Sequence, residues 1–108
     1  MGESPFDDEI RVGEVRDAEA FPETNKPHMT KLWIDLGDEQ IQSAAQLHYH
    51  YDADELVGRR VLCATSLGSV RIAGFKSEAL TVGVPSAAGY PVLVSPDDVD
   101  VPLGGVLY

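Results

Sequence analysis

The sequence predicts a small all-β domain, a closed five-stranded Greek-key barrel with one short helix after the third strand. Three observations predict this fold: stretches in which apolar and polar residues alternate, turn residues at close spacing between them, and one short helical pattern. The chain has 108 residues, which suits a single domain, and it contains no internal repeat and no low-complexity linker.

The first strand is expected to begin at Ile10, after an acidic lead-in of residues 1–9. Residues 10–108 then form the barrel domain. Gly13 breaks the alternation of apolar and charged residues, and a glycine within a strand marks a bulge or a sharp bend. Residues 20–29 contain two prolines and are expected to form a loop.

Residues 30–36 have the clearest strand pattern, because apolar side chains alternate with Lys31 and Trp33 on the other face. A glycine-containing turn leads into residues 40–47, the expected hairpin partner. Residues 52–58 show the pattern of a short helix with a capping box and a terminal glycine. The following elements are expected next: a central strand at 61–65, a loop at 67–74, the last barrel strand at 75–82, and extended segments at 90–94 and 101–108.

The balance of acidic and basic residues indicates which kinds of ligand the chain can bind. Eighteen acidic residues against eight basic ones give a formal net charge of -10, which argues against a non-specific nucleic-acid binder. The same composition is typical of proteins that stay soluble in multimolar salt, where the Debye length is about 3 Å or less. Under that alternative, a salt-loving source, net charge would scarcely repel a polyanionic partner.

No catalytic motif is visible. The single Cys63 lies in an apolar run and excludes an intrachain disulfide and a cysteine-based zinc site. His48 and His50 share a strand face, but a zinc site needs a third ligand, so no metal and no cofactor are expected. The sequence lacks a phosphate-cradling loop, a dinucleotide fingerprint and a nucleophile beside a base. A non-enzymatic, cytoplasmic protein without a membrane segment is the expectation.

Five motifs carry a family resemblance. In chain order they are IRVGEV at 10–15, KLWIDLG at 31–37, QSAAQL at 42–47, ELVGRRV at 55–61 and, most specifically, IAGFKSEAL at 72–80. The chain resembles the tRNA-binding domain family, and within it the free-standing CsaA proteins, described as export-related chaperones. The resemblance implies an OB-fold barrel, terminal extensions that build a homodimer, and binding of tRNA or another structured RNA. For the CsaA branch it implies binding of unfolded or pre-secretory polypeptides.

The chain departs from the CsaA pattern at two sites. A basic, proline-rich loop is replaced by Leu67-Gly68-Ser69-Val70-Arg71, and a Thr-Lys-Arg-Tyr stretch is replaced by His48-Tyr49-His50-Tyr51. Both changes remove basic groups from the expected nucleic-acid side. They weaken the RNA interpretation and leave the peptide interpretation untouched.

The RNA interpretation predicts contacts from Lys31, Trp33, Ser43, Arg71, Lys76, Ser77 and Glu78. Lysine and serine can bind phosphate or sugar oxygens, and an indole can stack on a base. Each has a structural alternative. Ser43 is small because a ligand approaches or because a neighbouring strand crowds it. Ser77 and Glu78 either contact the ligand or stabilise a turn by hydrogen bonds. Trp33 is an exposed platform or is buried beneath a terminal extension or a partner subunit.

The peptide interpretation predicts an apolar groove around Tyr49, Tyr51, Phe75 and Leu80. A homodimer is expected on separate grounds as well. Residues 99–108 stay apolar to the last residue, and a two-fold partner would remove that surface from water.

Overall fold

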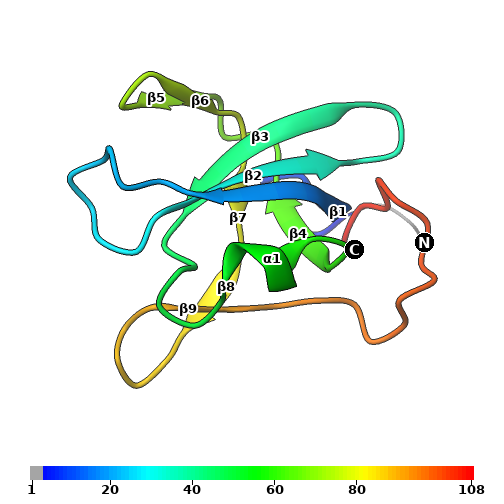
Figure 1. Ribbon diagram of the computed structural model, residues 1–108. Helices are drawn as coiled ribbons and strands as arrows, with labels where there is room; N and C mark the ends of the chain where they lie inside the picture. The colour runs from blue at the N-terminus through cyan, green and yellow to red at the C-terminus, as the bar shows by residue number, and fades with distance from the viewer. Residues whose placement is uncertain (1–3) are drawn as a thin grey trace.

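A computed structural model describes residues 4–108 and shows a five-stranded antiparallel sheet that curls into a nearly closed barrel (Figure 1). The strands pair in the order β3-β2-β1-β4-β7. Their bounds are β1 (Ile10–Ala20), β2 (Thr30–Asp35), β3 (Gln40–Ala45), β4 (Arg60–Ala64) and β7 (Leu80–Thr81). The predicted all-β barrel of OB type is therefore confirmed.

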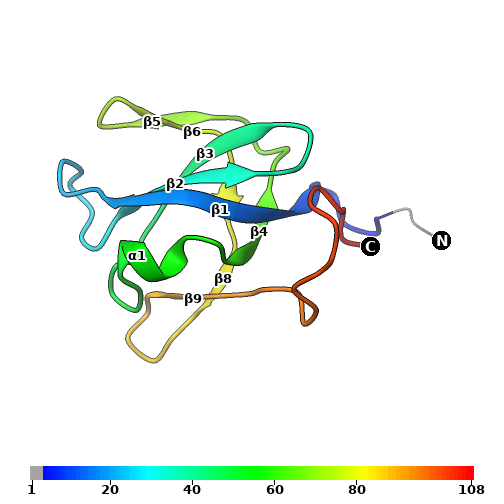
Figure 2. The same cartoon turned by 45° about the vertical axis from the view of Figure 1, so that its right-hand side comes forward.

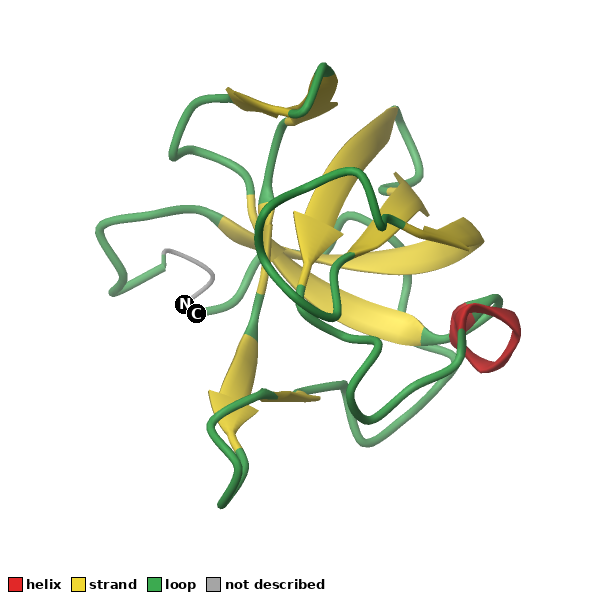
Figure 3. Cartoon of the chain, turned by 60° about the vertical axis from the view of Figure 1, so that its left-hand side comes forward, coloured by secondary structure: helices red, strands yellow, loops and turns green. Residues whose placement is uncertain are grey.

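Three small elements decorate the barrel. The hairpin β5 (Val70–Ile72) and β6 (Phe75–Ser77) stands beside β3, and the hairpin β8 (Gly83–Pro85) and β9 (Pro91–Leu93) follows the last barrel strand. The helix α1 (Ala53–Leu56) contacts β1 and contributes the fully buried Leu56 to the core, and Figure 3 shows the helix beside the strands.

The core fills the barrel because each strand turns alternate apolar residues inward. In β2, for example, Leu32 and Ile34 are buried while Lys31 and Trp33 are only partly covered. The buried cluster draws on β1 to β4, on α1 and on residues beside the strands. Its members are Val15, Leu32, Ile34, Leu36, Ile41, Leu47, Leu56, Val61, Cys63 and Ala79.

Side chains complete the barrel where the ladder stops, between β3 and the residues before β7. The backbone N–H of Glu78 donates to the carbonyl of Gln42 at 2.8 Å, and the carboxylate of Glu78 accepts from the N–H of Gln42 at 3.0 Å. One residue along, the hydroxyl of Ser77 accepts from the N–H of Ala44 at 3.2 Å. These bonds satisfy edge groups of β3 that no strand covers.

The bend in β1 lies at Arg16 and not at Gly13, where the sequence pattern put it. The register shift between β1 and β2 falls between Val15 and Asp17. Gly13 serves another purpose, because a Cβ there would collide with the side chain of Ile34. The glycine therefore lets β2 approach β1 closely.

The barrel has two distinct ends. The tail end comprises the β2–β3 turn (36–39) and residues 104–107, which return to the start of β1 through the bond from the N–H of Val12 to the carbonyl of Gly105 at 2.9 Å (Figure 2). The loop end comprises the β1–β2 loop (21–29), the β5–β6 hairpin, residues 46–51 and the tip of the β8–β9 hairpin (Figure 1).

Several predicted boundaries were wrong. The predicted loop 67–74 contains β5, because Ala73 and Gly74 both have positive φ and form a two-residue hairpin turn onto β6. The predicted strand 75–82 is split into β6 and β7 by the closure residues between them. Residues 101–108 form a single β-bridge at Val106 instead of a strand. Residues 1–3 of the predicted lead-in lie outside the described residues.

Candidate functional site

The outer face of β2 and β3 is flanked at the loop end by the β1–β2 loop and the β5–β6 hairpin. In five-stranded barrels of this kind, that face and the loops between strands one and two and between strands four and five hold oligomeric ligands. The hairpin occupies the second of these connections, because it joins β4 to β7. The topology therefore directs attention to this region.

An aromatic cluster covers the outer face of β2. Phe75 of the hairpin contacts Trp33 and Phe21 edge to face, with both ring centroids 5.7 Å from its own. The ammonium of Lys31 lies 4.7 Å from the Phe21 centroid and 5.4 Å from the Phe75 centroid, within the range of cation–π attraction. The partial cover over Trp33 thus comes from the hairpin.

Arg71 and Lys76 form a positive pair on the hairpin. The two residues are directly opposite each other in the β5–β6 ladder, and both are exposed. Strand alternation puts them on the face opposite Ile72 and Phe75. Like charges in opposite positions repel each other, and an anion bound between them would remove that repulsion.

Three of the predicted RNA contacts are engaged inside the barrel closure. Ser43 has 0% of its surface exposed, and its hydroxyl donates to the carbonyl of Ala79 at 2.8 Å and accepts from Thr81 at 2.9 Å. Ser77 and Glu78 satisfy the backbone of β3. This placement favours the structural alternative for all three.

The arginines at the tail end are bound by carboxylates. Arg11 bridges Asp38 at 2.9 Å, and Arg16 bridges Asp35 at 2.6 Å and Glu14 at 2.8 Å. The hydrogen bond from Arg11 lowers the pKa of the Asp38 carboxyl. The hydrogen bond from Arg16, followed by that from the Gly37 N–H, lowers the pKa of Asp35.

A third bridged arginine, Arg60, shares Glu14 with Arg16, and the side chains of Arg60 and Glu14 are each only 19% exposed. Five other cations contrast with these arginines. Within residues 4–108, Lys26, Lys31, Arg71 and Lys76 form no salt bridge, and neither does Arg59, whose guanidinium lies 5.0 Å from the centroid of the Tyr51 ring.

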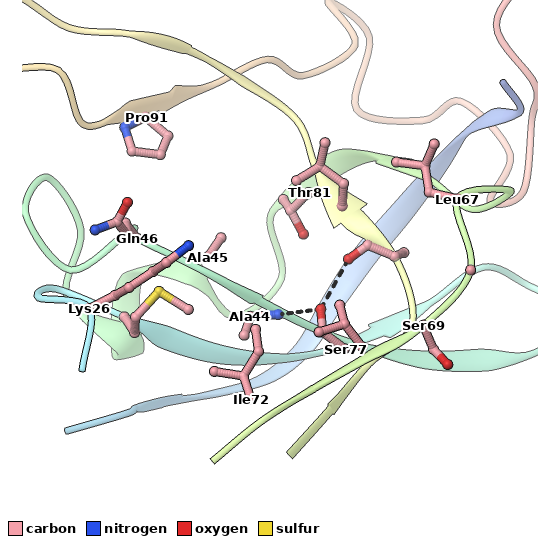
Figure 4. A pocket seen from close by; sticks show the side chains of 15 residues that line it. Lys26, Ala44, Ala45, Gln46, Leu67, Ser69, Ile72, Ser77, Thr81 and Pro91 are labelled. Carbon is pink, nitrogen blue, oxygen red and sulfur yellow. Dashed lines mark hydrogen bonds between the residues drawn. The ribbon is translucent and has the colours of Figure 1, made fainter. Parts of the chain in front are cut away.

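A pocket of about 560 Å³ lies between the β1–β2 loop, β3 and the hairpin (Figure 4). Lys26 and Gln46 lie at one end of it, and Leu67 and Ser69 at the other. The apolar residues that line it include Met29, Leu67, Val70, Ile72 and Leu80.

The four predicted peptide contacts do not share this pocket. Leu80, which is 52% exposed, lines it, whereas Phe75 belongs to the aromatic cluster. Tyr49 is 47% exposed and stacks on Tyr90 with centroids 4.6 Å apart. Tyr51 is half-buried, and its hydroxyl accepts a hydrogen bond from the backbone of Leu93 at 3.1 Å.

The reactivity of Cys63 and the capacity to bind a metal ion depend on burial and on how the side chains are arranged. Burial raises the pKa of the Cys63 thiol to about 12, so the thiolate that reacts as a nucleophile is scarce at neutral pH. In the part of the chain that the structure describes, no group of three histidine, cysteine or carboxylate side chains is arranged to hold a metal ion. No helix among residues 4–108 has the length and apolar character needed to cross a bilayer.

Two residues of the site were missed by the sequence patterns. Phe21 is almost fully buried although it lies at the start of a proline-containing loop. Lys26 lines three pockets of the loop end. The signal for Phe21 was an aromatic residue directly before Pro22 in a polar stretch; a loop lysine such as Lys26 gives no signal of its own.

Comparison with known proteins gives consistent results. The model of a family described as a putative tRNA binding domain matches residues 10–104. The methionine–tRNA ligase of Methanococcus aeolicus is 32% identical over 101 residues, which cover 92% of this chain and 14% of that protein. The chain therefore spans about a seventh of the length of that curated relative.

Two solved structures match along most of both chains. The chaperone CsaA of Bacillus anthracis has a TM-score of 0.83 at 33% identity and covers 93% of this chain and 90% of its own. The CsaA chaperone protein of Picrophilus torridus has a TM-score of 0.85 at 31% identity, with 94% and 92% covered.

Proposed function

Because this chain belongs to the tRNA-binding domain family, we propose that it binds tRNA or another structured RNA through the loop end of its barrel. The RNA backbone would lie along the β5–β6 hairpin and the β1–β2 loop. Arg71 and Lys76 would contact phosphates from the hairpin, and Lys26 from the loop. Lys31 and the accessible part of Trp33 would contact the RNA strand where it passes between the hairpin and the β1–β2 loop.

One observation carries the proposal: in the described chain, four of the five cations without a carboxylate partner gather at or beside the loop end. Lys26, Arg71 and Lys76 lie there and Lys31 lies next to it on β2, whereas the fifth, Arg59, lies over the ring of Tyr51. On a protein with a formal charge of -10, such a local exception is what an anionic ligand requires. Phosphate contacts of this kind supply most of the affinity for nucleic acids.

A homodimer belongs to the same proposal. Val99 and Tyr108 are 68% and 69% exposed, and both lie in the C-terminal segment. A two-fold partner that covers them would pair two loop ends and raise avidity without new kinds of contact. We further propose that the protein is non-catalytic, since the residues placed in the RNA site are cations and aromatic rings.

A binding titration with tRNA in low and in multimolar KCl tests the RNA proposal. Affinity should fall as salt rises, and Lys26→Gln combined with Lys76→Gln should weaken binding about tenfold at low salt. Arg16→Gln is the matched control, because it removes a cation that is already bridged. The proposal fails if folded protein binds no tRNA in either buffer.

A second function, peptide binding, is favoured by the apolar pocket beside β3. Met29, Ile72 and Leu80 line it, and the two matching solved structures are described as chaperones. Affinity for an unfolded apolar peptide should rise in salts that are excluded from the protein surface, whereas affinity for RNA should fall. Leu80→Glu should abolish peptide binding, and Val84→Glu, at an equally exposed valine that does not line the pocket, should not.

A further inference from the structure

All three histidines of the chain lie together at the loop end. The N–H of His48 donates to the carbonyl of His28 at 3.0 Å, which ties the β1–β2 loop to the residues after β3. The Tyr49 ring lies 5.4 Å from the His28 ring and 4.8 Å from the His50 ring, measured between centroids. All three histidines are exposed, so they form one surface cluster.

The β8–β9 hairpin holds this cluster in place. Its Tyr90 stacks on Tyr49, and the same ring contacts His28 edge to face at 4.9 Å. Nε2 of His50 lies 2.9 Å from the hydroxyl of Ser86 in the same hairpin. The imidazoles of His28 and His50 are therefore positioned by aromatic contacts and, for His50, by a hydroxyl. His48 is held through its backbone, and both His28 and His48 are exposed to solvent.

The cluster is continuous with the proposed RNA surface. His28 and His48 line a pocket of about 340 Å³ together with Lys26. Lys26 also lines the larger pocket that reaches the β5–β6 hairpin (Figure 4). One lysine thus lies between the two sites, and an RNA backbone that contacts it would pass beside the imidazoles.

We propose that Lys26, His28 and His48, with His50 beside them, form a phosphate-binding extension of the RNA surface that gains strength as the pH falls. The inference rests on the proposed RNA-binding function. A neutral imidazole offers one N–H donor, whereas a protonated one offers two donors and a full positive charge. Histidine is the side chain that makes this change between about pH 8 and pH 5.

Carboxylates outnumber cations around the cluster, but in the described chain they do not pair with its imidazoles. The ionisable groups on the elements around the cluster are Glu23 and Lys26 of the β1–β2 loop, Tyr49, Tyr51 and Asp52 beside the histidines, Asp54 and Glu55 of α1, Arg59 before β4, and Tyr90 of the β8–β9 hairpin. Among the residues from 4 to 108, none of these carboxylates forms a salt bridge with an imidazole. Protonation therefore adds positive charge that no internal ion pair consumes.

The experiment measures tRNA affinity and its salt dependence at pH 8 and at pH 5.5. The wild type should bind about fivefold to tenfold more tightly at pH 5.5, and the slope of log affinity against log salt should steepen by about 0.9 for each added phosphate contact. Two variants should lose the gain that the wild type shows between pH 8 and pH 5.5: His48→Gln with His50→Gln, and the same pair with His28→Asn. Asparagine is chosen at position 28 because the backbone there has a φ of 60°.

A gain-of-charge variant sharpens the test. His48→Lys should bind at pH 8 more tightly than the wild type and show a smaller change with pH, because its charge is permanent. Equal wild-type affinity at both pH values, or a pH response that persists in the histidine variants, would overturn the inference. Absence of tRNA binding by folded protein at either pH would instead overturn the proposed function itself.

Discussion

At the tail end of the barrel three arginines are held by carboxylates, whereas at the loop end four cations have no such partner among the described residues. Arg11, Arg16 and Arg60 tie the start of β1 to the β2–β3 turn and to β4. Lys26, by contrast, lies in the β1–β2 loop and lines a pocket, and Lys76 is exposed on β6. The same residue types thus stabilise one end and remain available for a ligand at the other.

The difference shows how an acidic protein can keep an anion-binding surface. At the tail end some of its carboxylates form salt bridges, and elsewhere carboxylates lie on the solvated surface. The net charge of the chain is therefore a poor guide to which ligands it binds, because binding depends on the local potential around the ligand. Four substitutions or titrations would break or sharpen this comparison.

Removing the shared carboxylate at the tail end should have the largest effect on stability. Glu14→Ala leaves the mostly buried Arg60 without its carboxylate partner and removes one of the two partners of Arg16. The uncompensated charge on Arg60 should cost about 2 kcal/mol of unfolding free energy. Glu23→Ala, an exposed carboxylate of the loop end, should cost less than about 0.5 kcal/mol. Urea denaturation compares them, and equal costs would show that the bridges stabilise nothing.

The second largest effect on stability should come from the side chains that close the barrel between β3 and β7. Ser77→Ala leaves the N–H of Ala44 without its acceptor, which should cost about 1–2 kcal/mol. Because the Ser77 hydroxyl is engaged inside the structure, RNA affinity per folded molecule should stay unchanged. A marked loss of affinity without a loss of stability would restore the direct ligand contact predicted from the sequence.

The barrel was predictable because its determinants are local and periodic. The alternation in β2 fixed the inward positions of Leu32 and Ile34, and both are fully buried. The β5–β6 hairpin was not predictable in the same way, since its turn puts Ala73 at a φ of 47°, a conformation that alanine rarely adopts. Tertiary packing of Phe75 on Trp33 and Phe21 compensates for that choice.

The site was predictable only in part, because residue type does not reveal whether a polar group is already satisfied. Lys76 and Glu78 are two residues apart, yet the lysine is exposed and the glutamate carboxylate is bonded to the backbone of β3. That bond joins residues 36 positions apart in the chain. Its existence depends on how the barrel closes, which no local pattern contains.

Acid should weaken the tail end selectively. Hydrogen bonds from Arg16 and Arg11 lower the pKa of Asp35 and Asp38 in the folded state. A carboxyl whose folded pKa is lowered contributes stability above its unfolded pKa, about 4, and loses that contribution as the pH falls through the folded value. The urea concentration at the unfolding midpoint should therefore decrease as the pH is lowered below 4. The decrease should be less steep in the double variant Asp35→Asn, Asp38→Asn. An unchanged slope in that double variant would contradict the assignment.

The smallest effect on stability, and the clearest contrast in binding, should come from single arginines at the two ends. Arg71→Gln relieves its repulsion with Lys76, which lies directly opposite, so the unfolding free energy should change by less than about 0.5 kcal/mol. If Arg71 contacts one RNA phosphate, the slope of log affinity against log salt should become shallower by about 0.9.

Arg16→Gln removes the same charge from the tail end and should leave that slope unchanged, since Arg16 is committed to Glu14 and Asp35. The reverse result, a shallower slope for Arg16→Gln and none for Arg71→Gln, would mean that RNA displaces the carboxylates from Arg16. The ligand would then bind across the start of β1 and the β2–β3 turn, and an existing salt bridge would be no guide to which cations are available.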